Sequence, residues 1–197
     1  MPAAVVLYED SQRKNEFVPH RFVRACVQDK TSLQPGFIEN ALDPRPMNGI
    51  NAIIRAVGEG HNVARRGEEV IALVDGDRIR DHLPALKVGA TAAEVQAELC
   101  KLAAPRFEFR LFVLDRNLES VLKAVAECFA AHEDICGPAG KSLGKNRLER
   151  DLALRRASKR ELNSERACVL KTVPSFACFI DHLATLCRDA FSETAQQ

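Results

Sequence analysis

Two aspartates, Asp75 and Asp77, follow directly on the apolar stretch of residues 70–74. Five apolar residues in succession, three of them β-branched, predict a strand buried on both faces of a sheet. Ligand sites in open parallel sheets form in the crevice outside the carboxyl ends of the strands. Two neighbouring carboxylates repel each other unless a cation or a proton intervenes, so the pair predicts a divalent metal site. The alternative is an ordinary turn, since Asp-Gly favours turns.

Other acids also follow predicted strands. Residues 3–8 form an apolar run that ends in Glu9 and Asp10, and the alternating segment 107–114 runs into Asp115. Right-handed crossover connections place the carboxyl ends of such strands at one edge of the sheet. Carboxylates gathered there can hold Mg²⁺ or Mn²⁺, which can activate a water and stabilise the leaving oxygen of a phosphodiester.

Segments with helical periodicity lie between and after the predicted strands. Apolar stripes predict helices from Pro19, from Asn48 as the capping residue, at 91–102 and at 118–129, then a charged helix at 146–161 and a last helix from Pro174. Residues 31–46, with three prolines and a glycine, are predicted to be loop with a short strand near 37–38, and 134–144 to be loop.

These elements predict an α/β fold with a mainly parallel, four-stranded sheet flanked by helices and a helical C-terminal extension. We expect residues 1–130 to form the α/β domain and residues 131–197 a basic helical extension packed on it. We expect His20 to be exposed on the first helix, the alternative being that it faces the Glu9 edge.

Charge is unevenly distributed along the chain. The formal net charge is +1, yet residues 141–171 carry ten Lys and Arg against four Asp and Glu, while residues 1–140 carry 17 against 20. A basic segment of this kind can contact phosphates without reading sequence, or it can be an ordinary solvated helix. The candidate nucleic-acid-binding residues are Arg147, Arg150, Arg155, Arg156, Lys159 and Arg160.

The seven cysteines include no C-x-x-C pair, and no apolar run approaches membrane-spanning length. We therefore expect a reduced cytoplasmic protein with small buried cysteines, no membrane association and no zinc site. Residues 137–142 look like a phosphate loop but lack its first glycine and follow a helix. Lys141 and Lys145 are candidates for neutralising a phosphate in the transition state, or belong to an ordinary loop.

The order of these motifs resembles the TOPRIM domain. The matching residues are Val5-Val6-Leu7-Tyr8-Glu9 and Ile71-Ala72-Leu73-Val74-Asp75-Gly76-Asp77, within a match over roughly residues 3–120. TOPRIM domains occur in topoisomerases, primases, and overcoming-lysogenization-defect and RNase M5-type nucleases. Residues 116–119 and 173–176 are similar to segments of small stand-alone bacterial TOPRIM-like proteins, often encoded beside ATPases.

The resemblance implies Glu9 as general acid/base or metal ligand, and Asp75 and Asp77 as ligands of Mg²⁺ or Mn²⁺. It also implies a further acid at Glu119. Asp10 stands where the family usually has glycine, and can itself be a ligand.

Two functions follow from the resemblance. The first is metal-dependent hydrolysis of DNA or RNA, as in a phage-defence or toxin effector. The second is a TOPRIM-like module that no longer cuts and instead binds nucleic acid or a partner ATPase. A homo-oligomer is compatible with both functions.

Overall fold

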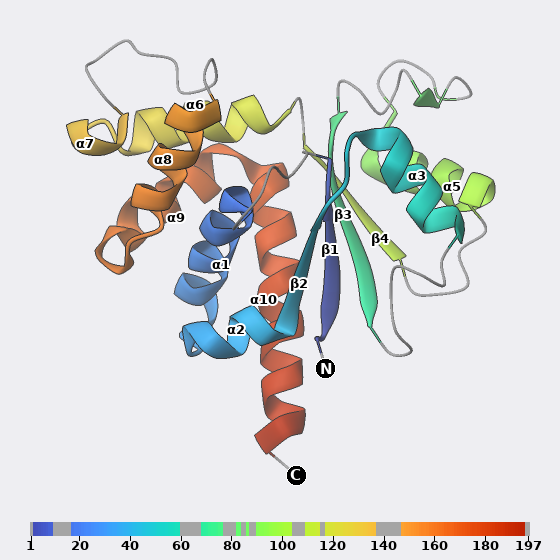
Figure 1. The fold of residues 1–197 in the computed structure, drawn as a ribbon, viewed down its shortest axis with the longest axis horizontal. Coiled ribbons are helices and arrows are strands. Elements are labelled where there is room, and N and C mark those ends of the chain that lie inside the picture. The colour runs from blue at the N-terminus through green and yellow to red at the C-terminus, as the bar shows by residue number, and fades with distance from the viewer. Residues whose placement is uncertain are drawn as a thin grey trace. The chain divides into compact units, whose positions relative to one another are not determined.

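Four parallel strands form the sheet of this protein, in the order β2-β1-β3-β4 (Figure 1). They are β1 (Ala4–Tyr8), β2 (Leu42–Pro46), β3 (Glu69–Asp75) and β4 (Phe109–Leu114). The computed structural model describes residues 2–9, 17–59, 68–76, 82–83, 86, 90–103, 109–114, 117–136 and 147–195. Helices flank the sheet and the C-terminal part is helical, so the predicted α/β fold class is confirmed.

The helices divide between two compact units. Unit 1 comprises residues 1–15 and 39–117, and unit 2 comprises residues 16–38 and 118–197, so the division falls within α2 (Pro35–Ala41). Unit 1 contains the sheet, α3 (Ile50–Glu59) and α5 (Ala92–Ala103). Unit 2 contains α1 (Val18–Thr31), α6 (Leu118–Cys128), α7 (Glu133–Cys136), α8 (Arg147–Ala157), the 3-10 turn η1 (Arg160–Leu162), α9 (Asn163–Thr172) and α10 (Pro174–Ala195). The boundary expected at residue 130 remains a prediction.

The two central strands, β1 and β3, are buried on both faces along nearly their whole length, and this is why both consist mainly of apolar residues. Val5 and Leu7 of β1 share one core with the apolar faces of α3 and α5, together with Val70, Ala72, Val74, Phe109 and Leu111 from β3 and β4. Ile50, Ile53 and Val57 of α3 provide the helical stripe expected from the sequence. Strand alternation therefore directs every second residue of the sheet into this core.

The edge strand β2 differs from the expected structure. The short strand predicted near 37–38 is wrong: α2 covers those residues, and the strand begins at Leu42. The Met47 N–H donates to the Tyr8 carbonyl (2.7 Å), so Pro44 and Pro46 occupy the alternate positions, whose missing N–H groups would point away from β1. Prolines at an edge strand leave the ladder intact and discourage pairing with another chain.

Unit 2 is built around α1 and α10, which pack against each other. The rings of Phe22 and Phe176 stack with centroids 6.3 Å apart, and Arg166 of α9 is buried in the same unit. The predicted charged helix at 146–161 is too long, because α8 ends at Ala157. The turn η1 and the helix α9, which were not predicted, follow it. The helix α7 covers residues 134–136 of the loop predicted at 134–144, and residues 137–144 lie outside the described residues.

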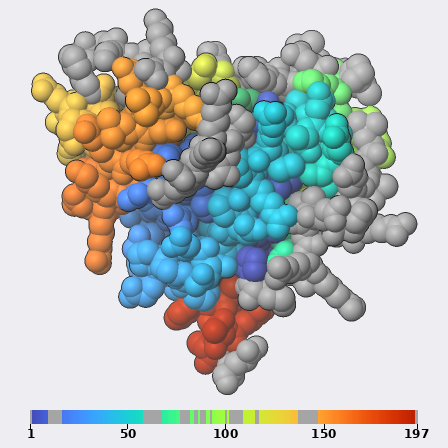
Figure 2. Space-filling model, in the orientation of Figure 1, coloured from blue at the N-terminus to red at the C-terminus, as the bar shows by residue number. Residues whose placement is uncertain are grey.

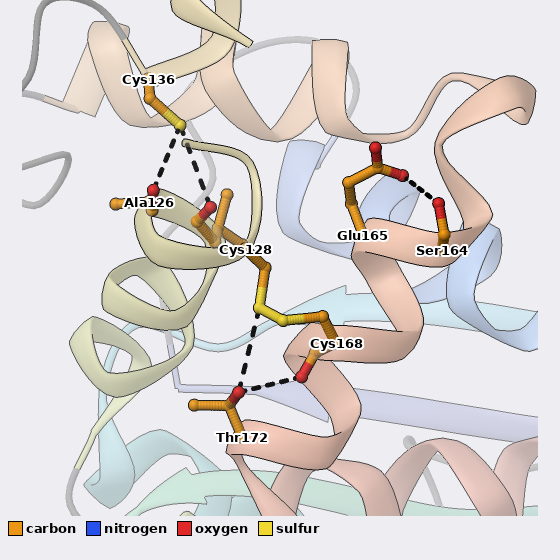
Figure 3. The surroundings of a disulfide bond; sticks show 8 residues. Ala126, Cys128, Cys136, Ser164, Glu165, Cys168 and Thr172 are labelled. Carbon is orange, nitrogen blue, oxygen red and sulfur yellow. Dashed lines mark hydrogen bonds between the residues drawn. A yellow bond between two sulfur atoms is a disulfide. The ribbon is translucent and has the colours of Figure 1, made fainter. Parts of the chain in front are cut away.

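The cysteines do not match the expectation of a fully reduced protein. Cys26 and Cys187 are buried thiols, as expected, but Cys128 and Cys168 form a disulfide that links α6 to α9 (Figure 3). Their Cα atoms lie 5.8 Å apart, and 40 residues separate them in the sequence. Local spacing motifs such as C-x-x-C cannot identify a pair this distant in the sequence, because only the tertiary fold brings the two sulfurs together.

No single helix within the described ranges is both long enough and apolar enough to cross a membrane. One pair, Arg160–Thr172 with Pro174–Ala195, meets the length and composition criteria together, with a bend of 119° between its members.

Candidate metal site at the carboxyl edge of the sheet

Glu9 and Asp75 lie together at the carboxyl edge of the sheet. Glu9 follows β1 and Asp75 ends β3, and these two strands are parallel neighbours in which Tyr8 is in register with Leu73. The backbone N–H of Asp75 donates a hydrogen bond to Oε2 of Glu9 (3.0 Å). Strand pairing therefore brings the backbone of Asp75 against the carboxylate of Glu9, 66 residues away in the sequence.

The amino end of α3 lies beside Glu9. The Gly49 N–H donates to the Glu9 carbonyl (3.0 Å), and the Gly49 carbonyl accepts the N–H of Ala52 (3.1 Å) in the first turn. Gly49 has φ +90°, a backbone conformation that glycine adopts without the strain other residues would have there. The chain can therefore turn sharply from the strand edge into the helix. Because helix amino ends carry a partial positive charge, the first turn of α3 offsets part of the negative charge at this edge of the sheet.

The role of Gly49 was not predicted from the sequence. Asn48 was expected to cap this helix, whereas the hydrogen bonds that join the turn to β1 and α3 involve Gly49. The Asn-Gly dipeptide between a strand and a helix was the available signal, because it marks a tight turn.

Glu9 and Asp75 supply carboxylate oxygens, the donor type that a hard divalent cation prefers. Mg²⁺ binds oxygen, keeps several waters and takes one or two carboxylates directly, which Glu9 and Asp75 can supply. Across the residues that the structure describes, no group of three His, Cys, Asp or Glu is arranged to hold a metal ion. Asp10, Asp77 and Asp115 lie outside the described residues.

The roles expected for Glu119, Lys141 and Lys145 at this edge remain predictions. Glu119 is exposed on the first turn of α6 and belongs to unit 2, whereas Glu9 and Asp75 belong to unit 1. Lys141 and Lys145 lie outside the described residues. His20, expected at the surface, is buried in α1 with only 3% of its surface exposed. Burial, together with the charge of Arg24, lowers the pKa of His20 to about 3, so this imidazole is neutral at physiological pH.

The first half of the basic segment carries as many acids as cations, because Glu149 and Asp151 accompany Arg147 and Arg150. Asp151 lies 3.2 Å from Nε of Arg150 and 3.9 Å from Nε of Arg147. The Arg150 side chain is only 15% exposed. These two arginines therefore present little unbalanced charge to a polyanion.

The second half is more open. Arg156 donates to the backbone carbonyl of Asp134, and Lys159 lies 4.0 Å from the Asp134 carboxylate. Arg155 and Arg160 are exposed. Figure 2 shows α8 and α9, in orange, at the surface of unit 2. The positive charge of this surface is thus concentrated in residues 155–160.

Comparison of the chain with protein-family models, with curated proteins and with solved structures finds no significant match. Any function assigned to the chain therefore depends on the geometry at Glu9 and Asp75.

Proposed function

We propose that this chain hydrolyses phosphodiester bonds in nucleic acid, with Mg²⁺ or Mn²⁺ as cofactor. The observation that carries the proposal is the hydrogen bond from the Asp75 N–H to Glu9, which places two acids from different strands at one sheet edge. The α3 amino end beside Glu9 is compatible with the same function, because it offsets part of the negative charge at that edge.

Each residue then has a definite task. Glu9 and Asp75 hold the cation, with Asp77 and Asp10 as further proposed ligands. A divalent cation at such a site polarises phosphate oxygens and makes water a nucleophile near neutral pH. The bond from the Asp75 N–H fixes the orientation of the Glu9 carboxylate, so that its geometry is set before the substrate arrives. Lys141 and Lys145 remain proposed partners of the phosphate.

The substrate class follows from charge. Arg155 and Arg160, with Arg156 and Lys159, form an exposed basic surface that suits the phosphates of DNA or RNA in a manner independent of sequence. A cytoplasmic, TOPRIM-like bacterial effector, acting alone, as a homo-oligomer or beside an ATPase, is the biological setting that we propose.

A second function is favoured by one observation. In the part of the chain that the structure describes, Glu9 and Asp75 are not joined by a third metal-ligating side chain. A module that binds nucleic acid or a partner ATPase, and does not cleave nucleic acid, would not need a third metal ligand.

The test compares wild type with Glu9→Gln and Asp75→Asn, which keep side-chain size and remove charge. Mixed DNA and RNA substrates are incubated with and without Mn²⁺. We expect metal-dependent cleavage by wild type, and in both variants a loss beyond the roughly 10- to 100-fold that changes in supporting residues cause. Glu98→Gln, an acid on α5 paired with Lys101, is the matched control and should cleave normally.

Metal binding is measured separately by thermal unfolding. An ion present at about 100 times its Kd stabilises the folded state by about 2.7 kcal/mol, so wild type should melt at a higher temperature with Mn²⁺ while Asp75→Asn should not. Full cleavage by Asp75→Asn would refute the mechanism. Mn²⁺ stabilisation and nucleic-acid binding without any cleavage would favour the second function.

A further inference from the structure

One face of α9 is joined to the C-terminal end of α6 by a disulfide. Glu165, Cys168 and Thr172 are spaced by three and four residues, so they share this face. Cys168 is bonded to Cys128, the last residue of α6, and the Thr172 hydroxyl lies 3.9 Å from the Cys128 sulfur (Figure 3). We call the contacts of this face the α6–α9 bridge.

A side-chain hydrogen bond lies beside the disulfide. Nε2 of His132, four residues after Cys128, is 2.9 Å from Oε1 of Glu165. Hydrogen bonds from Ser164 and His132 lower the pKa of Glu165 to about 2, so this carboxylate is ionised and can only accept. The ring nitrogen of His132 therefore donates. Both side chains are partly exposed, and such pairs hold helices together only weakly.

The neighbouring side of α9 is held independently of the disulfide. The guanidinium of Arg166 is buried and bonds both carboxylate oxygens of Asp29 on α1, at 2.6 and 2.9 Å. It also donates to the carbonyls of Ala157 (2.8 Å) and Lys159 (2.6 Å), at the end of α8. Loss of the disulfide would leave these hydrogen bonds in place, so α9 can separate from α6 and still be retained by unit 2.

The disulfide is accessible from solvent. Cys168 is exposed and Cys128 is partly exposed, whereas the thiols of Cys26 and Cys187 are buried. Exposed disulfides are the ones that exchange with thiols in solution, and structural ones are protected. The α6 and α9 helices also pack together through buried side chains such as Val169, and the disulfide lies at the solvent-facing side of this packing.

We propose that the Cys128–Cys168 disulfide is a redox switch, opened by a dithiol reductant, that releases α9 from α6 while Arg166 keeps the rest of unit 2 folded. One thiolate of the reductant attacks the sulfur of Cys168, an exposed residue, and expels the Cys128 thiolate, which takes up a proton. The second thiol of the reductant then loses its proton and displaces the Cys168 thiolate from the mixed disulfide, and the Cys168 thiolate takes up a proton. Two electrons pass to the protein, and the dithiol becomes a disulfide.

The experiment uses the full chain in a series of oxidised and reduced dithiothreitol mixtures. Acid quenching, alkylation and mass analysis give the fraction of the Cys128–Cys168 bond, and amide hydrogen exchange is measured in the same samples. On reduction we expect exchange in α9 to quicken by roughly tenfold or more, as for local opening, while α1 and α10 stay protected. Reoxidation should restore the slow exchange.

Two variants make the result specific. Cys168→Ser should show rapid α9 exchange at every redox ratio. Cys178→Ser, which removes an exposed free thiol on α10, should respond like wild type. Absence of the bond in the oxidised protein, unchanged α9 exchange on reduction, or loss of protection throughout unit 2 would each overturn the switch. Reduction of wild type tests it even if Cys168→Ser does not fold.

Discussion

At the scale of single residues, Arg166 is the buried charge on which unit 2 depends. Its guanidinium is about 2% exposed and faces Asp29, which is 24% exposed. Removing one member of a buried pair leaves the other without a partner, and this costs more than the pair contributes as a whole. Arginine suits the position because its planar fork bonds a carboxylate and two carbonyls at once.

We therefore predict that Asp29→Asn lowers the free energy of unfolding by about 3 kcal/mol, measured by urea titration. The neighbouring Lys30 is paired with Asp181, but both side chains are about half exposed. Lys30→Met should change stability by less than about 1 kcal/mol, because surface ion pairs contribute little. Equal effects of the two variants would contradict the role given to Arg166.

The buried His20 predicts a pH dependence. Its folded pKa of about 3 lies below the unfolded value of 6.5, so between these limits the unfolded chain binds more protons than the folded one. The contribution of neutral His20 to the free energy of unfolding is complete above pH 6.5 and is lost as the pH falls toward 3. In that window the free energy of unfolding changes with a slope approaching about 1.4 kcal/mol per pH unit. His20→Leu should flatten the stability profile in that window by urea titration at each pH. His182→Gln, a partly exposed control on α10, should keep the wild-type slope.

At the scale of elements, the turn from β2 into α3 determines where the helix amino end lies. Gly49 has φ +90° and connects the strand edge to the helix. A Cβ at this position would meet nothing within 4 Å, so a side chain would be opposed by backbone strain alone. The site therefore depends on the conformational freedom of one glycine, and not on space around it.

We predict that Gly49→Ala costs about 1–2 kcal/mol in stability. Gly36→Ala is the matched control: Gly36 lies in α2, its Cβ would also meet nothing within 4 Å, and its φ is not positive. This change should be neutral or stabilise by about 0.5 kcal/mol, because it restricts the unfolded chain. Thermal unfolding of both variants would show the difference, and a Gly49→Ala variant as stable as wild type would disprove the strain.

At the scale of the whole molecule, charge is balanced overall but not locally. The net charge is +1, and the basic segment contains one half in which Glu149 and Asp151 balance two arginines, and another half with exposed cations. Electrostatic attraction of a polyanion should therefore come mainly from the second half.

We predict that Arg155→Ala with Arg160→Ala weakens nucleic-acid binding. The slope of log K against log salt should fall in magnitude by about 0.7–0.9 for each phosphate that the double variant no longer neutralises. Arg147→Ala with Arg150→Ala should alter the slope less, since the acids of the same half already offset these cations. Filter binding at several salt concentrations measures both slopes. Similar slopes for the two double variants and wild type would identify α8 as a solvated surface.

Local patterns in the sequence were sufficient for much of the fold. The apolar run before Asp75 predicted β3, the alternation after Phe107 predicted β4, and the stripe beginning at Ile50 predicted α3, because burial on both faces or on one helical face leaves a periodic signature. The expectation that Glu9 and Asp75 share an edge of the sheet also came from the sequence. Parallel connections of one hand leave few other places for them.

Tertiary structure alone decided the features whose partners are distant in the chain. The bond from Asp75 to Glu9, the disulfide between Cys128 and Cys168 and the pairing of Arg166 with Asp29 join residues 66, 40 and 137 positions apart. No local pattern encodes such contacts, because each depends on where whole elements pack. The same holds for the edge position of β2, which makes its prolines tolerable, and for the burial that keeps His20 neutral.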